Sequence, residues 1–226
     1  QSWSVISGVA PENRADLAIS QCYTNLENQT GMQICWPAYR KVEDDIGLIS
    51  RCVPGKKENG AVFNHASAWF VLASIMNGKA EDAWRIYSKM IPFNSSNKVG
   101  TDRYDTEPYV YSEYVTSREH ETEGQASHSW LTGSSVWMYR IGLDWILGLR
   151  TSLKGITVDP HIPAHWDNVQ VARKFRGKTL SITILNPKGA NQGVQELLVN
   201  GEKASSSWIN PKNYEGDTIE VKATLG

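Results

Sequence analysis

The sequence predicts a two-part α+β protein, helical to about residue 150 and β-rich after it. Before Arg150, apolar residues recur at the three- and four-residue spacing of buried helix faces. After Arg150 they alternate with polar residues, as in short strands separated by turns. A chain of 226 residues can form one large domain or two small ones. We expect two, residues 1–150 and 151–226.

The first long helix is expected after Pro11, a residue suited to a first helical turn. Ala15, Ile19 and Cys22 then fall on one face at helical spacing. Gly31 lies just beyond the predicted end of this helix.

Two further helical regions follow. Residues 61–90 predict two helices separated at Asn77-Gly78, and the first of them is apolar on nearly all sides, so it should be buried. A last helix is expected from Ser134 to Leu147, with Gly148 as its stop. Residues 31–60 and 92–128 between these helices are expected to be long loops, which in compact domains are usually functional.

The final part predicts an antiparallel sheet or sandwich. Its alternating segments are "GITVDP", "NVQVARKFRG", "TLSITILNP", "QELLVNG" and "DTIEVKATL". Asn200-Gly201 is a strong hairpin-turn signal between two of them.

Charge and cysteine content narrow the classes of function. The formal net charge is −1, which excludes a basic nucleic-acid surface or a polybasic membrane patch. No apolar run reaches the roughly 18 residues of a membrane span. Cys22, Cys35 and Cys52 fit neither a zinc site nor a disulfide framework, so we expect no bound metal and three reduced, mostly buried thiols in a cytoplasmic protein.

Nine tryptophans and nine tyrosines are unusual for this length. They indicate either a large helical core or aromatic platforms for sugar rings, and composition favours the core. The three tryptophans of residues 128–148 are expected mainly to pack an inner helix.

The first candidate site lies in "PGKKENGAVFNHASAW", where Lys57, Glu58 and Asn59 precede a buried helix. His65 falls in the first turn of that helix. A lone histidine on such a face is more often a hydrogen-bonded core residue. Its position beside free backbone N–H groups and two lysines nevertheless favours an anion site.

The second candidate is Glu113, which lies among Tyr109, Tyr111 and Tyr114. An acid among tyrosines suits a site for sugar hydroxyls. The other acids of this segment are expected to belong to a solvated loop: Glu107, Glu119, Glu121 and Glu123.

The third candidate is Thr132-Gly133, directly before the last helix. A threonine hydroxyl, free N–H groups and a glycine that admits close approach could bind phosphate. The same residues also describe an ordinary helix cap, which is the commoner case.

Several common catalytic motifs are absent. The chain contains no GxxxxGK[ST] phosphate loop, no GxGxxG, no HExxH and no GxSxG. A pair of carboxylates for ordinary glycoside hydrolysis does not stand out among its many acids.

Taken together, six segments resemble the C-terminal part of the cellobiose and chitobiose phosphorylase family, glycoside hydrolase family 94. They occur in the family's order and span residues 1 to about 180: "QSWSVISG", "PAY", "PGKKENGAVFNHASAW", "EPYVYSEY", "SWLTGSSVWMYRIGLDWILGLR" and "GITVDPHIPAHW". The resemblance implies the final helices of an (α/α)6 barrel for residues 1–150, followed by a small antiparallel β-sandwich-like domain.

The resemblance also implies an activity. Members of the family cleave a β-glycosidic bond of a disaccharide with inorganic phosphate and invert the anomeric centre, giving an α-sugar 1-phosphate. Phosphate is a co-substrate and no cofactor is needed. Since phosphate is the nucleophile, one general-acid Asp suffices.

Residue by residue, the resemblance assigns phosphate binding to His65, Thr132 and Gly133. It places Lys57 and Glu58 on the sugar side, with Lys57 near the acceptor. Glu113 is also on the sugar side, at a position where cellobiose phosphorylases have Gln near the donor sugar. This departure leaves open whether the donor is glucose or N-acetylglucosamine.

The general-acid Asp of the family is expected before Gln1, so no catalytic acid is assigned in these residues. The chain opens with apolar residues already in a helical pattern, and we expect it to be part of a longer polypeptide. The expected partners are the N-terminal part of the same enzyme, a β-linked disaccharide or oligosaccharide with phosphate, and a second copy in a homodimer, but no nucleic acid or membrane.

Two other functions remain open at this stage. One is a non-catalytic carbohydrate-binding unit, in which aromatic residues stack on sugars. The other is the phosphorylase-like end of a β-glucan synthase.

Overall fold

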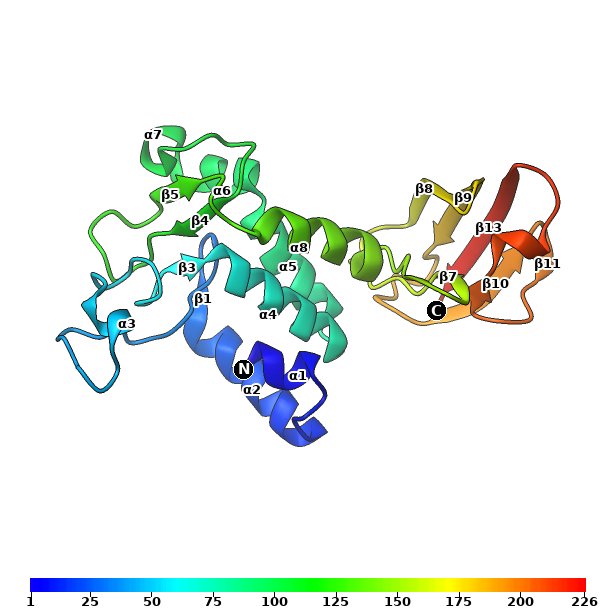
Figure 1. Ribbon diagram of the computed structural model, residues 1–226. Coiled ribbons are helices and arrows are strands. Elements are labelled where there is room, and N and C mark those ends of the chain that lie inside the picture. The colour runs from blue at the N-terminus through cyan, green and yellow to red at the C-terminus, as the bar shows by residue number, and fades with distance from the viewer. The chain divides into compact units, whose positions relative to one another are not determined.

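The computed structural model describes all 226 residues, which fold as two compact units, Gln1–Tyr139 and Arg140–Gly226 (Figure 1). No helix combines the length and the apolar character that crossing a membrane requires.

The first unit is mainly helical. Its helices are α1 (Ser2–Ile6), α2 (Glu12–Leu26), α3 (Leu48–Arg51), α4 (Asn64–Met76), α5 (Ala80–Met90), α6 (Pro92–Val99), α7 (Thr101–Tyr104) and α8 (Ser134–Arg140). Its strands are β1 (Glu27–Asn28), β2 (Gly31–Met32), β3 (Val62–Phe63), β4 (Ser112–Val115) and β5 (Ala126–Ser129). β1 and β2 form one antiparallel pair, and β3, β4 and β5 form a second antiparallel sheet.

The predicted helices are confirmed. Pro11 caps α2, which buries Ala15, Ile19 and Cys22. α4 buries nine of its 13 residues, because it is apolar on nearly every side. It lies beside the amphipathic α5 (Figure 1), and the two helices separate at Asn77-Gly78 as predicted.

The expectation of a long loop over residues 92–128 is wrong. This segment contains α6, α7, β4 and β5, whose side chains help to build the core. Its strands are only four residues long, too short for alternation to be read from sequence. Residues 33–47 and 52–61, by contrast, contain no strand or helix other than α3 between them, as predicted.

The second unit begins with a π-helix, Ile141–Ile146, and Gly148 follows it with a φ of +70°. A Cβ at Gly148 would lie 2.0 Å from the carbonyl carbon of Asp159, so only glycine fits there. The strands of this unit are β6 (Thr151–Ser152), β7 (Gly155–Thr157), β8 (Asn168–Phe175), β9 (Lys178–Leu185), β10 (Val194–Val199), β11 (Glu202–Lys203), β12 (Trp208–Ile209) and β13 (Thr218–Leu225). A short 3-10 helix, Pro211–Asn213, precedes β13.

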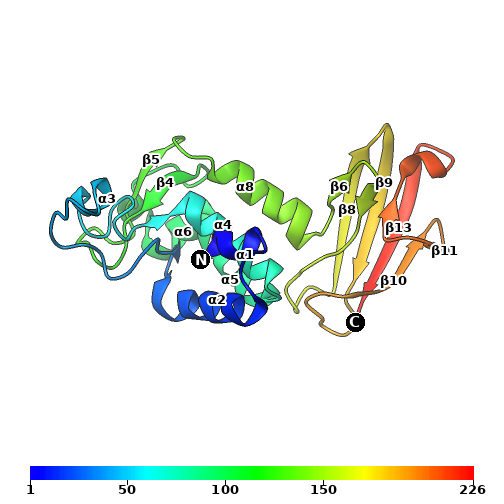
Figure 2. The same ribbon diagram turned by 60° about the horizontal axis from the view of Figure 1, so that its bottom comes forward.

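The larger sheet of this unit has the order β11-β10-β13-β9-β8 (Figure 2), and a smaller one has the order β12-β7-β6. Alternate residues of β9 and β13 are buried, as the alternating pattern predicts. Asn200-Gly201 forms the predicted hairpin turn between β10 and β11.

The expectation of a wholly antiparallel β domain is wrong for one pair of strands. β9 and β13 are parallel, with Ile182 opposite Val221. The segment between them contains β10, β11 and β12, and it is long enough for the crossover connection that a parallel pair requires.

Candidate functional site

The site begins at the first turn of α4. Asn64, the first residue of the helix, donates from Nδ2 to the carbonyl oxygen of Ser112 at 2.9 Å and to its hydroxyl at 3.1 Å. These bonds fasten the start of α4 to β4, the strand that carries Glu113. His65 and Glu113 therefore lie on two elements that these hydrogen bonds join.

The structure brings His65 and Gly133 into contact. A Cβ built on Gly133 would lie 2.9 Å from Cε1 of His65, which is too close for any real side chain. The backbone of Gly133 does not have the positive φ that only glycine favours. Glycine is required at this position because the imidazole ring lies against it.

The Thr132 hydroxyl makes local hydrogen bonds of the kind that a helix cap makes. Oγ1 of Thr132 accepts a hydrogen bond from the backbone N–H of Ser134 at 3.1 Å and lies 2.5 Å from the Ser134 hydroxyl. These hydrogen bonds hold the turn that carries Gly133 and so keep Gly133 beside His65.

His65 lies in an aromatic cluster formed by Trp3, Trp69 and Trp137. Its ring centroid is 4.5 Å from that of Trp69 and 6.2 Å from that of Trp137. Trp3 packs edge-on against both tryptophans. Burial lowers the pKa of His65, so the ring is neutral at neutral pH.

Two nitrogens of this cluster are buried and have no hydrogen-bond partner: His65 Nε2 and Trp69 Nε1. A histidine of the satisfied core type would have a partner for this nitrogen, because buried polar atoms are almost always hydrogen-bonded. The His65 ring is thus oriented by packing and left with an unused polar atom.

A second group of side chains surrounds Glu113. The Lys57 ammonium lies 3.4 Å from Oε2 of Glu113, and Nδ1 of His128 lies 3.6 Å from the same oxygen. His128 belongs to β5, which pairs with β4, so it stands opposite Glu113 in the sheet. Sequence reasoning found Lys57 and Glu113 but missed His128, because the pairing of two four-residue strands leaves little signal.

Backbone strain supports the same location. Six non-glycine residues have positive φ, and three of them are Lys57 at 47°, His128 at 57° and Trp130 at 70°. Such conformations cost of order 1–3 kcal/mol each and concentrate at functional sites. Trp130 is also 71% exposed and donates from Nε1 to Glu107, so the expectation that it packs the core is wrong.

Glu58 lies between two thiols. Sγ of Cys52 is 3.9 Å from its carboxylate, and Sγ of Cys35 is 3.8 Å from its backbone oxygen. All three cysteines are free, but only Cys22 is fully buried. Burial raises the pKa of the Cys35 and Cys52 thiols, and the nearby Glu119 and Glu58 carboxylates, respectively, raise them further, which makes both thiols weak nucleophiles.

Glu119 was expected to be a solvated loop residue, and this is wrong. Its side chain is only 6% exposed, and its carboxylate accepts hydrogen bonds from Ala38 N at 2.6 Å and Arg40 Nη2 at 3.1 Å. Buried Asn59 links the same loops by donating to the backbone oxygens of Tyr39 and Cys52. These bonds hold the two sides of the loop that carries Lys57 and Glu58.

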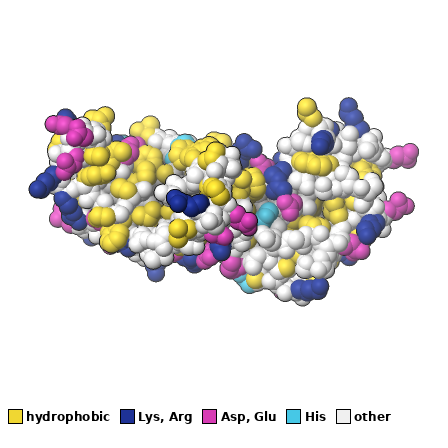
Figure 3. Space-filling model, turned by 90° about the horizontal axis from the view of Figure 1, so that it is seen from below, with side chains coloured by type: hydrophobic (Ala, Val, Ile, Leu, Met, Phe, Trp, Pro, Cys, Tyr) yellow, Lys and Arg dark blue, Asp and Glu magenta, His cyan; other side chains and the backbone are white.

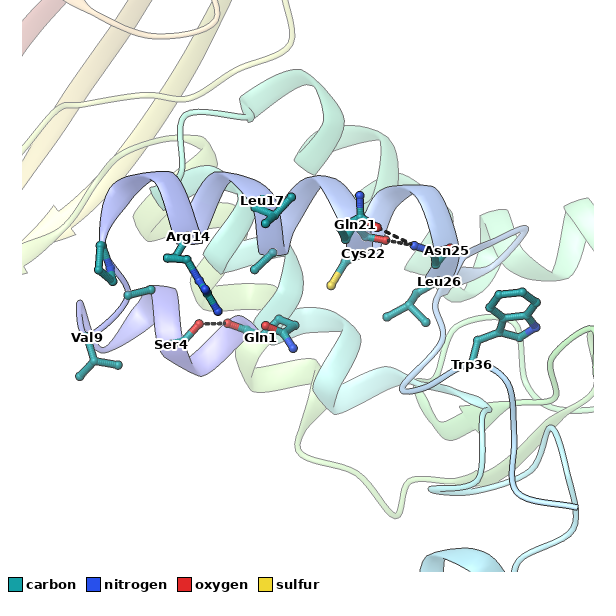
Figure 4. Close-up of a pocket in the computed structure, with 13 residues that line it drawn as sticks. Gln1, Ser4, Val9, Arg14, Leu17, Gln21, Cys22, Asn25, Leu26 and Trp36 are labelled. Carbon is teal, nitrogen blue, oxygen red and sulfur yellow. Dashed lines mark hydrogen bonds between the residues drawn. The ribbon is translucent and has the colours of Figure 1, made fainter. Parts of the chain in front are cut away.

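One groove of the first unit lies away from these residues. It has a volume of about 730 Å³ and is lined by α1, α2 and Trp36 (Figure 4). Arg14 is its only charged lining residue, so it contains no acid for catalysis. Exposed hydrophobic side chains gather on the underside of the helical unit (Figure 3). Two residues that line the groove, Val9 and Leu17, are exposed.

No three histidine, cysteine, aspartate or glutamate side chains are grouped so that they could hold a metal ion.

Comparison with known proteins places the helical unit among the glycosyl hydrolases. The profile described as "Glycosyl hydrolase 94 superfamily, catalytic domain" matches residues 1–148. The chain therefore belongs to the glycosyl hydrolase 94 superfamily.

Three relatives illustrate the range of the family. An N,N'-diacetylchitobiose phosphorylase from Vibrio furnissii is 37% identical over 96% of this chain and 27% of its own length. One from Vibrio proteolyticus is 33% identical over 99% of this chain and 27% of its own length. A cyclic beta-(1,2)-glucan synthase from Rhizobium meliloti is 30% identical over 81% of this chain and 7% of its own length. The chain thus spans about a quarter of the length of the phosphorylases it matches.

Proposed function

We propose that this chain forms the phosphate-binding side of the active site of an inverting phosphorylase acting on β-linked disaccharides of glucose or N-acetylglucosamine. The observation that carries the proposal is the contact between His65 and Gly133, with Nε2 of His65 buried and unpartnered. A phosphate oxygen would supply the missing partner. The similarity to phosphorylases over nearly the whole chain supports the same activity.

In the proposed reaction, a phosphate oxygen attacks the anomeric carbon of the donor sugar as the bond to the glycosidic oxygen breaks. The departing oxygen takes a proton from an Asp outside these residues. His65, Thr132 and Gly133 hold the phosphate on the side opposite the leaving sugar, which inverts the centre and gives an α-sugar 1-phosphate. No cofactor takes part.

The sugar side is assigned to Lys57, Glu58 and Glu113. An ion pair joins the Lys57 and Glu113 side chains, and the hydrogen bonds of Glu119 and Asn59 hold the loop around Lys57 and Glu58. Carboxylates and ammonium groups at such positions can accept from and donate to sugar hydroxyls. Two other relatives are named for acidic disaccharides, a glucuronide and cellobionic acid, so the family includes both neutral and acidic substrates.

The proposal includes an architecture. Residues 1–150 would be the last helices of an (α/α)6 barrel and residues 151–226 a C-terminal β domain, with the general acid supplied by the preceding part of the enzyme. A cytoplasmic homodimer is also proposed. The three free thiols are consistent with a reducing compartment, and the mass of the complete enzyme in solution would test the dimer.

The decisive experiment is a screen of the complete enzyme in the synthetic direction. α-Glucose 1-phosphate and α-N-acetylglucosamine 1-phosphate are each offered with a series of acceptor sugars, and phosphate release is measured. Phosphate should be released with at least one pair, and the product should contain a β linkage by NMR. Absence of release with every pair, or a product with an α linkage, would contradict the proposal.

The glucan synthase relative supports a second candidate, the phosphorylase-like end of a β-glucan synthase. Higher identity and the larger covered share of the diacetylchitobiose phosphorylases favour the first. A β-glucan product formed from a nucleotide sugar, without phosphate release from a sugar phosphate, would favour the second. A chain that binds sugars but catalyses neither reaction would be the remaining alternative, a carbohydrate-binding unit.

A further inference from the structure

The indole N–H of Trp69 is the second buried group of the aromatic cluster without a hydrogen-bond partner. Trp69 follows His65 by one turn of α4, so the two side chains are neighbours on one face of the helix. Their ring centroids are 4.5 Å apart, and the rings are tilted by 52°. A single ligand that pairs with Nε1 of Trp69 and Nε2 of His65 would therefore satisfy both nitrogens.

The chemistry of the two rings restricts the kind of ligand. An indole nitrogen only donates, so the partner of Trp69 must be an acceptor. Burial lowers the pKa of His65, and the neutral imidazole can also donate from Nε2. A tetrahedral oxyanion accepts on several oxygens at once. Two hydrogen bonds of about 2.9 Å and the width of one oxyanion span two nitrogens in rings this close.

One other unpaired polar atom shares a cavity with Trp69. Gln33 and Trp69 both line a cavity of about 270 Å³, and Oε1 of Gln33 is buried without a donor. Gln33 is fastened by donation from its Nε2 to the backbone oxygen of Gly60 at 3.0 Å, and no hydrogen bond joins it to Trp69. A water shared by these two side chains is the occupant against which an oxyanion must be tested.

The surroundings hold the indole in one orientation and leave the corner open. Trp3 and Trp137 pack edge-on against Trp69, with centroids 5.4 and 6.1 Å from its own. A donor that is already immobile loses little entropy when a ligand binds. Gly133, which contacts His65, is exposed, so a small anion can approach the two rings from solvent.

We propose that Trp69 binds the phosphate co-substrate together with His65, with the indole N–H donating to one phosphate oxygen and Nε2 of His65 to another. The proposal rests on the proposed function, which places phosphate at His65. Both donors are neutral, so they orient the phosphate without neutralising it as a cation would.

The test compares Trp69→Phe with Trp137→Phe in the complete enzyme, with inorganic phosphate as the varied substrate of phosphorolysis. Each variant keeps an aromatic ring and removes one indole N–H from the same cluster, but only that of Trp69 is buried and unpaired. Trp69→Phe should raise the KM for phosphate by about tenfold, as expected for one hydrogen bond to a charged group, and change the KM for the sugar little. Trp137→Phe should leave the KM for phosphate near the wild-type value.

Three results would overturn the inference: an unchanged KM for phosphate in Trp69→Phe, an equal rise in Trp137→Phe, or an equal rise in the KM for the sugar. The last two would assign Trp69 to packing of the cluster. Gln33→Met removes the unpaired acceptor of the shared cavity and should leave the KM for phosphate unchanged. A rise equal to that of Trp69→Phe would identify a shared water instead of phosphate.

Thermal unfolding gives a second measurement that requires no turnover. Inorganic phosphate should raise the Tm of the wild type and of Trp137→Phe by mass action, and the same concentration should raise that of Trp69→Phe less. Equal rises in all three would contradict the inference. A raised KM for phosphate in His65→Ala without one in Trp69→Phe refutes only the inference, whereas an unchanged KM in both refutes the proposed function.

Discussion

The two halves of the candidate site, around His65 and around Glu113, have opposite surroundings. Around His65 the surroundings are aromatic and uncharged, and a buried nitrogen is left without a partner. Around Glu113 the surroundings are charged and partly exposed, and the protein provides the counter-ion itself. We expect a ligand to complete the first half, whereas the second half already contains an ion pair. Both are fixed by one short stretch, residues 128–133, which follows directly from β5 into the turn before α8.

The strongest way to break the first half is to fill the space beside His65. Gly133→Ala would place a methyl group 2.9 Å from the imidazole, so the ring or the turn must move. A displacement of this size at a binding group commonly costs on the order of 10²-fold in rate. Phosphorolysis kinetics should show this loss in kcat/KM for phosphate, while the KM for the sugar changes little. Unaltered phosphate kinetics would show that the contact has no part in catalysis.

Removal of the imidazole should have a somewhat smaller effect. His65→Ala deletes one hydrogen bond to a charged ligand, worth roughly 1.5–3 kcal/mol, so the KM for phosphate should rise and kcat fall by about tenfold or more. His165→Ala, at an exposed histidine of the second unit, is the matched control. Equal effects of the two substitutions would remove His65 from the phosphate site.

The half around Glu113 can be disrupted by removing Glu119, which holds the neighbouring loop. Glu119→Ala leaves the buried N–H of Ala38 without an acceptor, which should lower the free energy of unfolding by about 1–3 kcal/mol. The exposed Arg40 adds little to this. Thermal unfolding should show the loss, and kinetics should show a raised KM for the sugar with an unchanged KM for phosphate. Glu121→Ala should change neither quantity, and an equally stable Glu119→Ala variant would contradict the positioning role.

The smallest expected effect is a pH dependence of stability, which should arise at His65 in the aromatic half of the site. Burial lowers the pKa of His65 below its ordinary value of 6.5, so the unfolded chain binds the proton more readily than the folded one. Stability from this residue is fully present above pH 6.5 and declines as the pH falls from 6.5 toward the lower folded pKa. Unfolding measured without phosphate should show the stability difference between wild type and His65→Gln shrinking over that range. A difference independent of pH would mean that the ring is not desolvated.

Much of this architecture could be predicted from sequence, because long periodic segments carry the signal. α2, the pair α4 and α5, and the strands β8, β9 and β13 follow from apolar spacing alone. The positions of Thr132 and Gly133 before a helix follow from turn chemistry. That His65 lies against Gly133 came only from resemblance, since 67 residues separate them in the sequence.

The features that sequence reasoning missed depend on long-range contacts. Nothing in the local pattern distinguishes the buried Glu119 from its exposed neighbour Glu121, because burial is decided by Ala38 and Arg40 on a distant loop. His128 lies opposite Glu113 because β4 pairs with β5, and strands of four residues are too short for this pairing to be predicted from sequence. The parallel pairing of β9 and β13 likewise depends on which strands meet, and alternation in sequence is the same for both orientations.

The bond between Glu119 and Ala38 joins residues 81 positions apart, which has a consequence for synthesis of the chain. A ribosome adds about 5–20 residues per second, so about 4 to 16 s pass between the emergence of the two partners. During that interval the loop from Tyr39 to Lys57 has no acceptor for the Ala38 N–H, whereas α4 and α5 are close in sequence and can already pair. The α4–α5 pair can therefore form before the carboxylate that closes the sugar side has been synthesised.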